Sequence, residues 1–178
     1  MILTKPPADQ YTDLYRPYID LVANDEDLLT LLKDQQQEII QCFEALAAAD
    51  KADYRYAPGK WSVKELLMHM VDAERYMSFK SFVTMRGDKE TLLHHLNREV
   101  YLENAVVAQK TIPSILEEFT AVRQATIALF RSIPEEKEGL VASHANPNHA
   151  ISAAALGYAI AGHAAHHLKI VRDRYIIK

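Results

Sequence analysis

The chain has only one cysteine, Cys42, and five glycines among its 178 residues. A single cysteine cannot form an internal disulfide, so the fold does not depend on an oxidising compartment. The scarcity of glycine argues against collagen-like chains, Gly-rich chains and many all-β folds. Several catalytic signatures are also missing, because the sequence has no Gly-rich phosphate loop, no cysteine pair and no His-Glu-x-x-His motif.

Long hydrophobic runs and a strong excess of one charge are absent too. The least polar stretch, residues 151–165, is interrupted by four small or polar residues: Ser152, Gly157, Gly162 and His163. The sequence therefore predicts no membrane span, and its first residues lack the apolar run of a signal peptide, so we expect a cytoplasmic protein. The net charge of −4, with histidine counted as neutral, lacks the electrostatic footprint of a general nucleic-acid binder.

What the sequence does contain is apolar residues at helical spacing. Hydrophobic residues make up 49% of the chain and charged residues 25%, which is typical of globular proteins. The chain is long enough to bury a substantial core, and its length predicts one domain over residues 1–178.

Four segments have the period of long amphipathic helices, at about 24–49, 62–86, 111–133 and 152–175. Asn24 is the expected cap of the first, and Ser62 with Glu65 forms a capping box that begins the second. Gly87 suits the position just after the end of that second helix. About two dozen residues separate the second and third helices, and 91–107 is a candidate for a short helix. We therefore expect an all-α, four-helix bundle of the up-and-down type with a long crossover connection.

Two of the eight histidines lie in the apolar stripe of the last segment. At about 100° per residue, His163 and His167 share a sector with Leu156, Ile160 and Ile170. A polar group in that position is costly unless it is bonded. Imidazoles four residues apart in a helix lie side by side, which suits one metal ion. The alternative is two core histidines that are hydrogen-bonded to carboxylates or backbone groups.

A third metal ligand has to come from another helix, and His69 in the second segment is the best candidate. It lies near the edge of that segment's apolar stripe, a position that would suit a side chain lining a pocket that opens from the bundle. A boundary histidine bonded to a neighbour is the alternative. Three neutral imidazoles would hold Zn²⁺, Ni²⁺ or Fe²⁺, with Mn²⁺ as a further candidate, and leave coordination positions open. Asp72, one turn away, is either an orienting partner or a solvent-exposed group.

The other histidines and the cysteine give weaker signals. His166 lies off the midline of the pair, and is either a supporting group or part of the helix surface. Four histidines fall in connections and are expected at the surface: His94, His95, His144 and His149. Cys42 is expected to be a small core thiol rather than a nucleophile. The sequence thus identifies no catalytic residue among its own side chains.

Taken together, these residues resemble the DinB/YfiT-like superfamily of metal-binding four-helix bundles, over nearly the whole chain. The resemblance rests on residues 59–65 (Gly-Lys-Trp-Ser-Val-Lys-Glu), on His69 with Asp72 and Glu74, and on residues 162–167 (Gly-His-Ala-Ala-His-His). In that family one histidine of the second helix and two of the last bind a divalent metal. The resemblance therefore implies a metal site at three positions of this sequence: His69, His163 and His167.

Members of this family differ in activity. Some resemble thiol S-transferases that use a low-molecular-weight thiol, and others are described as metal-dependent hydrolases or as stress-induced proteins. Many relatives carry an acidic or polar residue just after the first late histidine, where this chain has Ala164. A general base from that position is therefore missing here.

These observations lead to the hypothesis of a metal-dependent enzyme. A divalent ion on three histidines would activate a low-molecular-weight thiol or water for transfer to, or hydrolysis of, a small electrophile. The alternatives are a non-catalytic metal-binding or stress-response bundle, and a structural bundle whose histidines are simply hydrogen-bonded. An open coordination position on the metal that faces a pocket would distinguish the enzyme from the non-catalytic metal-binding bundle. The many alanines of the last helix leave room for a ligand or pack closely, and a homodimer is a family-level expectation.

Overall fold

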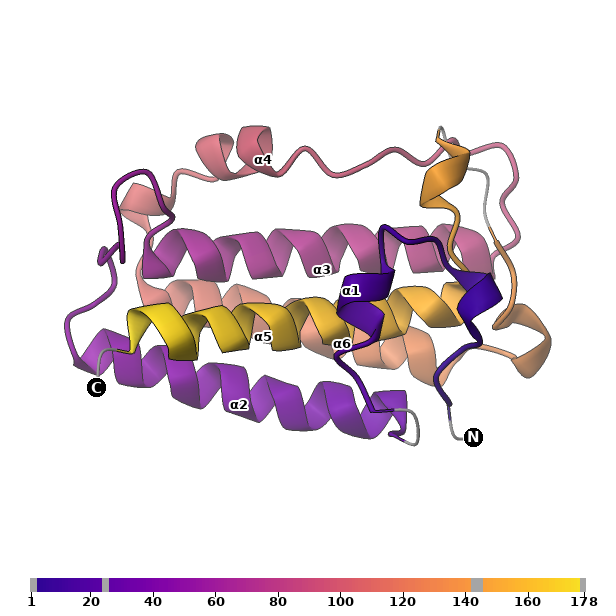
Figure 1. Cartoon of the computed structure of the whole chain (residues 1–178), viewed down its shortest axis with the longest axis horizontal. Coiled ribbons are helices and arrows are strands. Elements are labelled where there is room, and N and C mark those ends of the chain that lie inside the picture. The colour runs from indigo at the N-terminus through magenta and orange to yellow at the C-terminus, as the bar shows by residue number, and fades with distance from the viewer. Residues whose placement is uncertain (1–2, 24–25, 142–145, 177–178) are drawn as a thin grey trace.

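The computed structural model of this chain describes residues 3–23, 26–141 and 146–176. Four long helices lie side by side along one axis (Figure 1). They are α2 (Leu28–Ala48), α3 (Val63–Met85), α5 (Ile112–Arg131) and α6 (Ala153–Ile170), the last continuing into a π-helical turn, Val171–Tyr175. The described residues contain no β-strand, only two isolated bridges. The expected all-α, four-helix bundle is therefore confirmed.

Capping groups explain where the helices begin and end. Asp27 caps α2 by accepting a hydrogen bond from the backbone N–H of Thr30, whereas Asn24, the predicted cap, lies outside the described residues. Ser62 and Glu65 form the predicted capping box at the start of α3. Gly87 follows the end of α3 with a φ of +69°, a conformation that a residue without a Cβ adopts at little cost.

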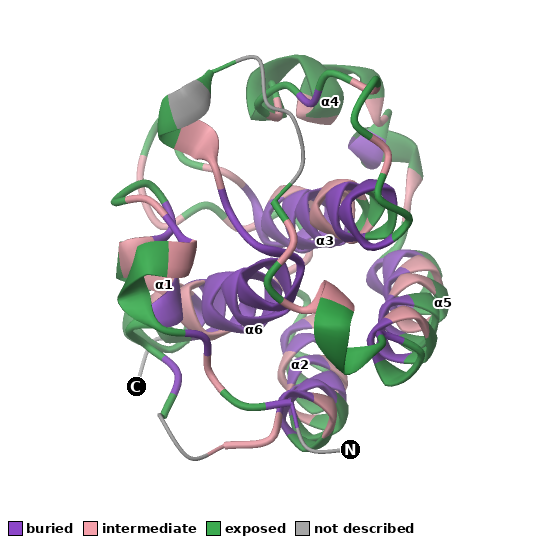
Figure 2. Cartoon of the chain, turned by 90° about the vertical axis from the view of Figure 1, so that its right-hand side faces the viewer, coloured by how far each residue is buried: buried purple, intermediate pink, exposed green. Residues whose placement is uncertain are grey.

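Around the bundle axis the helices follow the order α2, α5, α3, α6, and their buried residues face one another (Figure 2). The most extensive packing joins α3 to α6 and to α5, whereas α2 and α3 touch little because they lie across the diagonal. Consecutive helices are neighbours in a simple up-and-down bundle. The expected up-and-down order is therefore wrong for α2 and α3. The connection 49–62 is long enough to carry the chain across the end of the bundle to the diagonal position.

The helices α3 and α5 run in the same direction, so the chain has to return along the bundle between them (Figure 1). This return is the predicted long crossover. It spans residues 86–111, lies along α3 and contains the short helix α4 (Arg98–Asn104). The candidate short helix within 91–107 is thus present, and it gives α3 a cover on the side away from the bundle axis (Figure 2).

The N-terminal segment covers α6. Its short helix α1 (Arg16–Ile19) packs against α6. A Cβ on Gly162 would overlap the backbone carbonyl of Tyr18, so glycine is what lets the two helices approach this closely. Six alanines of α6 are buried, which favours close packing of this helix over space for a ligand: Ala153, Ala154, Ala155, Ala159, Ala161 and Ala164.

A buried ion pair joins three of the long helices. Arg123 of α5 is fully buried, and its Nε and Nη2 donate to the two carboxylate oxygens of Glu74 in α3, at 2.8 and 2.7 Å. Its Nη1 donates to the backbone carbonyl of Leu32 in α2 at 2.8 Å. The pair therefore fixes how α2, α3 and α5 sit against one another. None of the helices in the described ranges has both the length and the apolar character to cross a membrane.

Candidate metal centre

The three histidines predicted as metal ligands lie together inside the bundle. His69 comes from α3, and His163 and His167 come from adjacent turns of α6. All three are buried, with exposed fractions of 7%, 9% and 7%. Since α3 and α6 are neighbours in the bundle, His69 reaches two side chains that are far away in the sequence. The apolar stripe that contains His163 and His167 explains why both face inward.

The Nε2 atoms of this triad converge. Nε2 of His163 lies 3.1 Å from Nε2 of His69 and 3.1 Å from Nε2 of His167. The three nitrogens all lie within 4.8 Å of one another. Two imidazole nitrogens on one tetrahedral zinc ion are about 3.3 Å apart. The triad therefore has the spacing of three ligands of a single divalent ion.

The interior of the bundle keeps these imidazoles neutral. Burial, and after it the charge of Arg98, lower the pKa of His69 to about 4. Burial also lowers the pKa of His167 to about 2. The pKa of His163 lies well below its ordinary value, because of burial and then of the neighbouring His167 and His69. A neutral imidazole offers a lone pair, so each ring is in the state that metal binding requires.

The hydrogen bonding of the triad also fits a cation. Neutral imidazoles whose lone pairs face one another repel unless a proton or a cation lies between them, and one proton can bridge only two of the three nitrogens. Nδ1 of His167 is buried and has no hydrogen-bond partner among the described residues, so this ring contacts polar atoms only through Nε2. A set of three imidazole nitrogens is typical of sites for Zn²⁺, Ni²⁺ or Fe²⁺.

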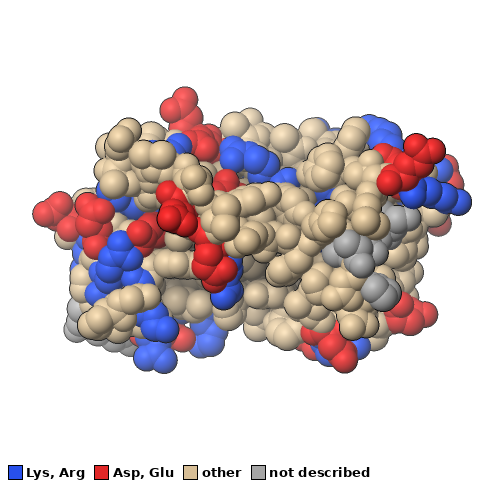
Figure 3. Space-filling model, turned by 90° about the horizontal axis from the view of Figure 1, so that it is seen from above, with Lys and Arg blue, Asp and Glu red and all other residues tan. Residues whose placement is uncertain are grey.

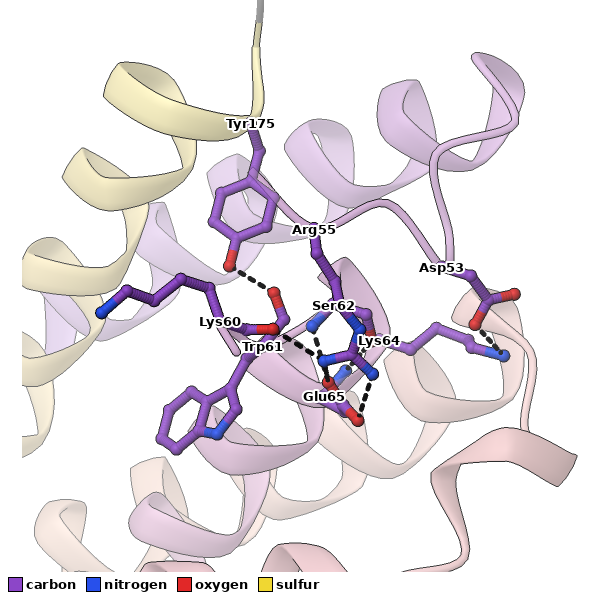
Figure 4. Close-up of polar contacts among 8 residues, drawn as sticks. All are labelled: Asp53, Arg55, Lys60, Trp61, Ser62, Lys64, Glu65 and Tyr175. Atoms are coloured by element: carbon purple, nitrogen blue, oxygen red, sulfur yellow. Dashed lines mark hydrogen bonds and ion pairs between the residues drawn. The ribbon is translucent and has the colours of Figure 1, made fainter. Parts of the chain in front are cut away.

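A polar network at the start of α3 holds Trp61 against the triad (Figure 4). The hydroxyl of Tyr175 donates to the backbone carbonyl of Trp61 at 2.7 Å, and Arg55 forms an ion pair with Glu65 beside it. The indole extends away from this network, and its centroid lies 4.7 Å from that of His69. The motif 59–65 therefore positions one wall of the site.

A pocket of about 360 Å³ opens onto the triad. Its walls come from α3, from α6 with His166, from the N-terminal segment with Tyr15 and Tyr18, and from the crossover with His95 and Arg98. The volume is in the range of small-molecule sites. Three protein ligands beside an accessible pocket are the pattern of a catalytic metal site, whereas structural zinc sites are closed by a fourth protein ligand.

The remaining sequence-predicted residues are not part of the triad. His166 is half-buried, lines the pocket and packs edge-on against Tyr18, with ring centroids 5.5 Å apart. Asp72 lines a different groove, where Arg75 lies 3.2 Å from its carboxylate, so the structure gives no support to a partnership with His69. Cys42 is half-buried, and burial raises the pKa of its thiol, as expected for a thiol without catalytic function.

The histidines in the connections differ from one another. His94 is exposed, as predicted. His95 is also exposed, but it lines the pocket, and its ring centroid lies 5.0 Å from that of the half-buried His149. His144 lies outside the described residues. None of the predictions from the sequence placed His95 at the site, because its position depends on the path of the crossover.

Lys80 is a pocket residue that the sequence reasoning missed. It follows His69 by eleven residues in α3, and at about 100° per residue this places the two within about 20° of the same face. The helical spacing from His69 could therefore have indicated that Lys80 lies on the face of α3 that forms the site. A lone lysine is normally assigned to the helix surface, whereas here Lys80 is buried and lines the pocket together with His95 and Leu96 of the crossover.

Comparisons with known proteins agree with this fold. The family model of the DinB superfamily matches residues 31–171. Among solved structures, YfiT from Bacillus subtilis, described as a probable metal-dependent hydrolase with an unusual four-helix bundle topology, matches with a TM-score of 0.68. The match covers 95% of this chain and 92% of that chain, at 16% sequence identity. No curated protein matches by sequence.

Proposed function

This chain belongs to the DinB superfamily, and from that membership and its histidine triad we propose that it is a metal-dependent enzyme acting on a small molecule. In this proposal His69, His163 and His167 bind one divalent ion, with Zn²⁺, Ni²⁺ and Fe²⁺ as the first candidates and Mn²⁺ as the next. The main support is the convergence of three neutral Nε2 atoms at a pocket.

When bound, such an ion is a Lewis acid that lowers the pKa of a water or thiol and so supplies a nucleophile at neutral pH. The residues of the chain hold the ion, keep the triad away from bulk water and orient the small electrophile. Trp61 and Tyr18 keep bulk water from the triad, since their rings pack against His69 and His163. Hydrolysis and transfer to a low-molecular-weight thiol are the two reactions that this chemistry allows.

Two observations favour an enzyme over the alternatives. The pocket gives a substrate access to the triad, which a purely structural site does not need. YfiT, the similar bundle, is itself described as a probable metal-dependent hydrolase. Among the described residues, none of those lining the pocket has a carboxylate, and Ala164 follows His163. The proposal therefore assigns no Asp or Glu as a general base.

Elemental analysis of protein purified without a metal-affinity tag tests the proposal. We expect about one equivalent of a divalent metal in the wild type and its loss in His163→Ala, because two imidazoles hold a metal far less tightly than three. His94→Ala is the matched control, since His94 is exposed and outside the triad, and it should retain the metal. A wild type that neither contains nor takes up metal would overturn the proposal.

Assays on the metal-loaded protein then separate the two reactions. Release of 4-nitrophenol from 4-nitrophenyl esters reports hydrolysis, and conjugation of a thiol to 1-chloro-2,4-dinitrobenzene reports transfer. Turnover that is lost in His163→Ala and on chelation supports the enzyme. Stoichiometric metal without turnover of either kind of substrate would favour the non-catalytic metal-binding alternative.

A further inference from the structure

The pocket beside the triad has positive charge and, among its described lining residues, no negative charge. Lys80 of α3 and Arg98 of α4 both line it, and no described Asp or Glu does. This is the opposite of the whole chain, whose net charge is −4. A concave site with positive side chains attracts an anionic ligand, because ammonium and guanidinium groups form charge-assisted hydrogen bonds with acid groups.

Lys80 is the more unusual of the two cations. Only 2% of it is exposed, and lysine is among the residues least often buried in proteins. Its Nζ lies 5.0 Å from the ring centroid of Tyr76, which also lines the pocket. Burial lowers the pKa of Lys80 to about 8, so most of these side chains are still charged at pH 7. An ammonium has three N–H donors, so Lys80 can bind an anion while it keeps its other contacts.

The triad and Lys80 lie at opposite ends of one helix face. His69, Ala73, Tyr76 and Lys80 all belong to α3 and all line the pocket. The eleven residues from His69 to Lys80 span about 16 Å along the helix axis. Helical side chains lean toward the N-terminus, here toward His69, and a lysine side chain covers roughly 6 Å of that length. A ligand that joins the two ends is therefore about 10 Å long.

Between the two ends the pocket is lined by small and aromatic residues. Ala73 leaves space over the middle of the α3 face, and Tyr15 and Tyr18 approach from the N-terminal segment. Trp61 closes the end near His69. Aromatic rings of this kind bury an apolar or aromatic ligand body. They offer little stabilisation to a second charged group in the middle of the ligand.

We propose that this pocket binds an elongated small molecule with one anionic end, of the aryl- or alkyl-carboxylate class. The acid group pairs with Lys80, the apolar body lies along Ala73 and Tyr76, and the other end reaches the triad. Arg98 is exposed and its guanidinium carbon lies 5.9 Å from the ring centroid of Trp61, so it adds positive charge at the pocket mouth. The inference deepens the proposed function and rests on it for the reaction, whereas the anion site consists of residues outside the triad.

The only tryptophan of the chain, Trp61, lies in the pocket, so intrinsic fluorescence reports ligand binding. Metal-free protein is titrated with 4-phenylbutyrate, which is about 10 Å long, and with 4-phenylbutan-1-ol, its neutral counterpart. We expect the carboxylate to bind at least about tenfold more tightly than the alcohol, as for a hydrogen-bonded charge pair. Phenylacetate, too short to span the pocket, should bind more weakly than 4-phenylbutyrate.

Lys80→Met tests the assigned contact. We expect it to weaken binding of the carboxylate about tenfold and to leave binding of the alcohol unchanged, because only the ion pair is lost. Lys33→Met is the matched control, since Lys33 is exposed on α2 and the same charge is removed far from the pocket. Lys80→Gln, which keeps a donor without the charge, is the second variant if Lys80→Met fails to fold by circular dichroism.

The outcome is independent of the metal analysis, because the titration uses metal-free protein. Equal binding of carboxylate and alcohol, no binding of either, or a preference that survives in folded Lys80→Met would overturn the inference even if the metal is present. A preference that Lys80→Met abolishes supports the anion site even if the triad binds no metal, in which case the proposed function fails and the anion site stands.

Discussion

His163 and His94 have the same side chain and opposite surroundings. His163 lies inside the bundle, where burial lowers its pKa far below the ordinary value, whereas His94 is exposed on the crossover. The same contrast separates Lys80, which is 2% exposed, from Lys33 on the surface of α2. At the scale of the residue, burial strengthens the polar interactions of a side chain, because water competes with the partner of every exposed group.

The buried ammonium of Lys80 should make stability depend on pH. Its pKa in the folded chain is about 8, below the ordinary 10.5, so between these pH values the unfolded chain binds more protons and folding is favoured as pH rises. Below pH 8 the full cost of the buried charge remains. We therefore expect the stability of the wild type relative to Lys80→Met to rise between pH 8 and pH 10.5, by on the order of 2 kcal/mol.

Urea unfolding of both proteins from pH 7 to pH 10.5 measures this difference. The stability of Lys80→Met relative to the wild type should fall through the window from pH 8 to pH 10.5, and the comparison cancels the titration of tyrosines that both proteins share. A difference that stays constant with pH would show that the lysine is not desolvated.

Gly162→Ala should disturb the contact of α1 with α6. A Cβ at this position would overlap the backbone carbonyl of Tyr18, and backbone cannot move aside as a flexible side chain can. We expect a loss of about 1–3 kcal/mol in the free energy of unfolding, as for other overpacked sites. Gly139→Ala is the matched control, because its Cβ would meet only the Gln10 side chain at 3.6 Å. Equal effects of the two substitutions in urea unfolding would contradict the close approach.

At the scale of the element, α3 uses two faces for two purposes. One face carries His69 and Lys80 and forms a wall of the pocket. Another face carries Glu74, which pairs with Arg123 of α5. The crossover exists because α3 and α5 run in the same direction (Figure 1), and its return along α3 supplies His95 and Arg98 to the pocket. The topology of the bundle therefore builds part of the site.

Removal of Arg123 should destabilise the bundle strongly. Arg123→Leu leaves the carboxylate of Glu74 buried and unpaired, which costs roughly 3–5 kcal/mol in the free energy of unfolding. The double variant Arg123→Leu/Glu74→Leu should recover most of that loss, because two apolar side chains need no partner. Urea unfolding of the two single variants and the double variant measures the coupling. Additive losses in the double variant would show that the ion pair is not what joins α3 to α5.

At the scale of the whole molecule, charge is balanced on the surface and unbalanced in the pocket. Acidic and basic side chains are intermixed on the face seen in Figure 3, whereas the described lining of the pocket has positive charge only. The surface in that view therefore has no broad field of one sign, and attraction of an anion depends on the local field of the pocket. The single domain, the homodimer, the cytoplasmic location and the stress role stay predictions.

Heating of the whole chain tests the single domain and the metal site together. We expect one cooperative transition by calorimetry, because the histidine triad joins α3 to α6 and Arg123 joins α5 to α3 and α2, so that all four long helices are connected through α3. Removal of the metal should lower the melting temperature by about 5–10 °C, which corresponds to free metal near 100 times its dissociation constant. His163→Ala should not respond to chelation. Two separate transitions would contradict one domain, and an unchanged melting temperature in the wild type would contradict the metal site.

The local features of this protein could be predicted from its sequence, because they depend on residues a few positions apart. The spacing of apolar residues indicated four long helices, and Ser62, Glu65 and Gly87 marked the two ends of one of them. The i, i+4 spacing in an apolar stripe indicated that His163 and His167 point inward together. Each of these follows from the geometry of one helix and needs no knowledge of its neighbours.

The contacts between helices were decided only by the tertiary structure. The diagonal placement of α2 and α3, the pairing of Glu74 with Arg123 and the burial of Lys80 depend on which surfaces pack together. Helical periodicity specifies which face of a helix is buried, but many helix orders satisfy the same set of apolar faces. The choice among them is made by side-chain packing across the whole core, and the pocket beside the triad exists because of that choice.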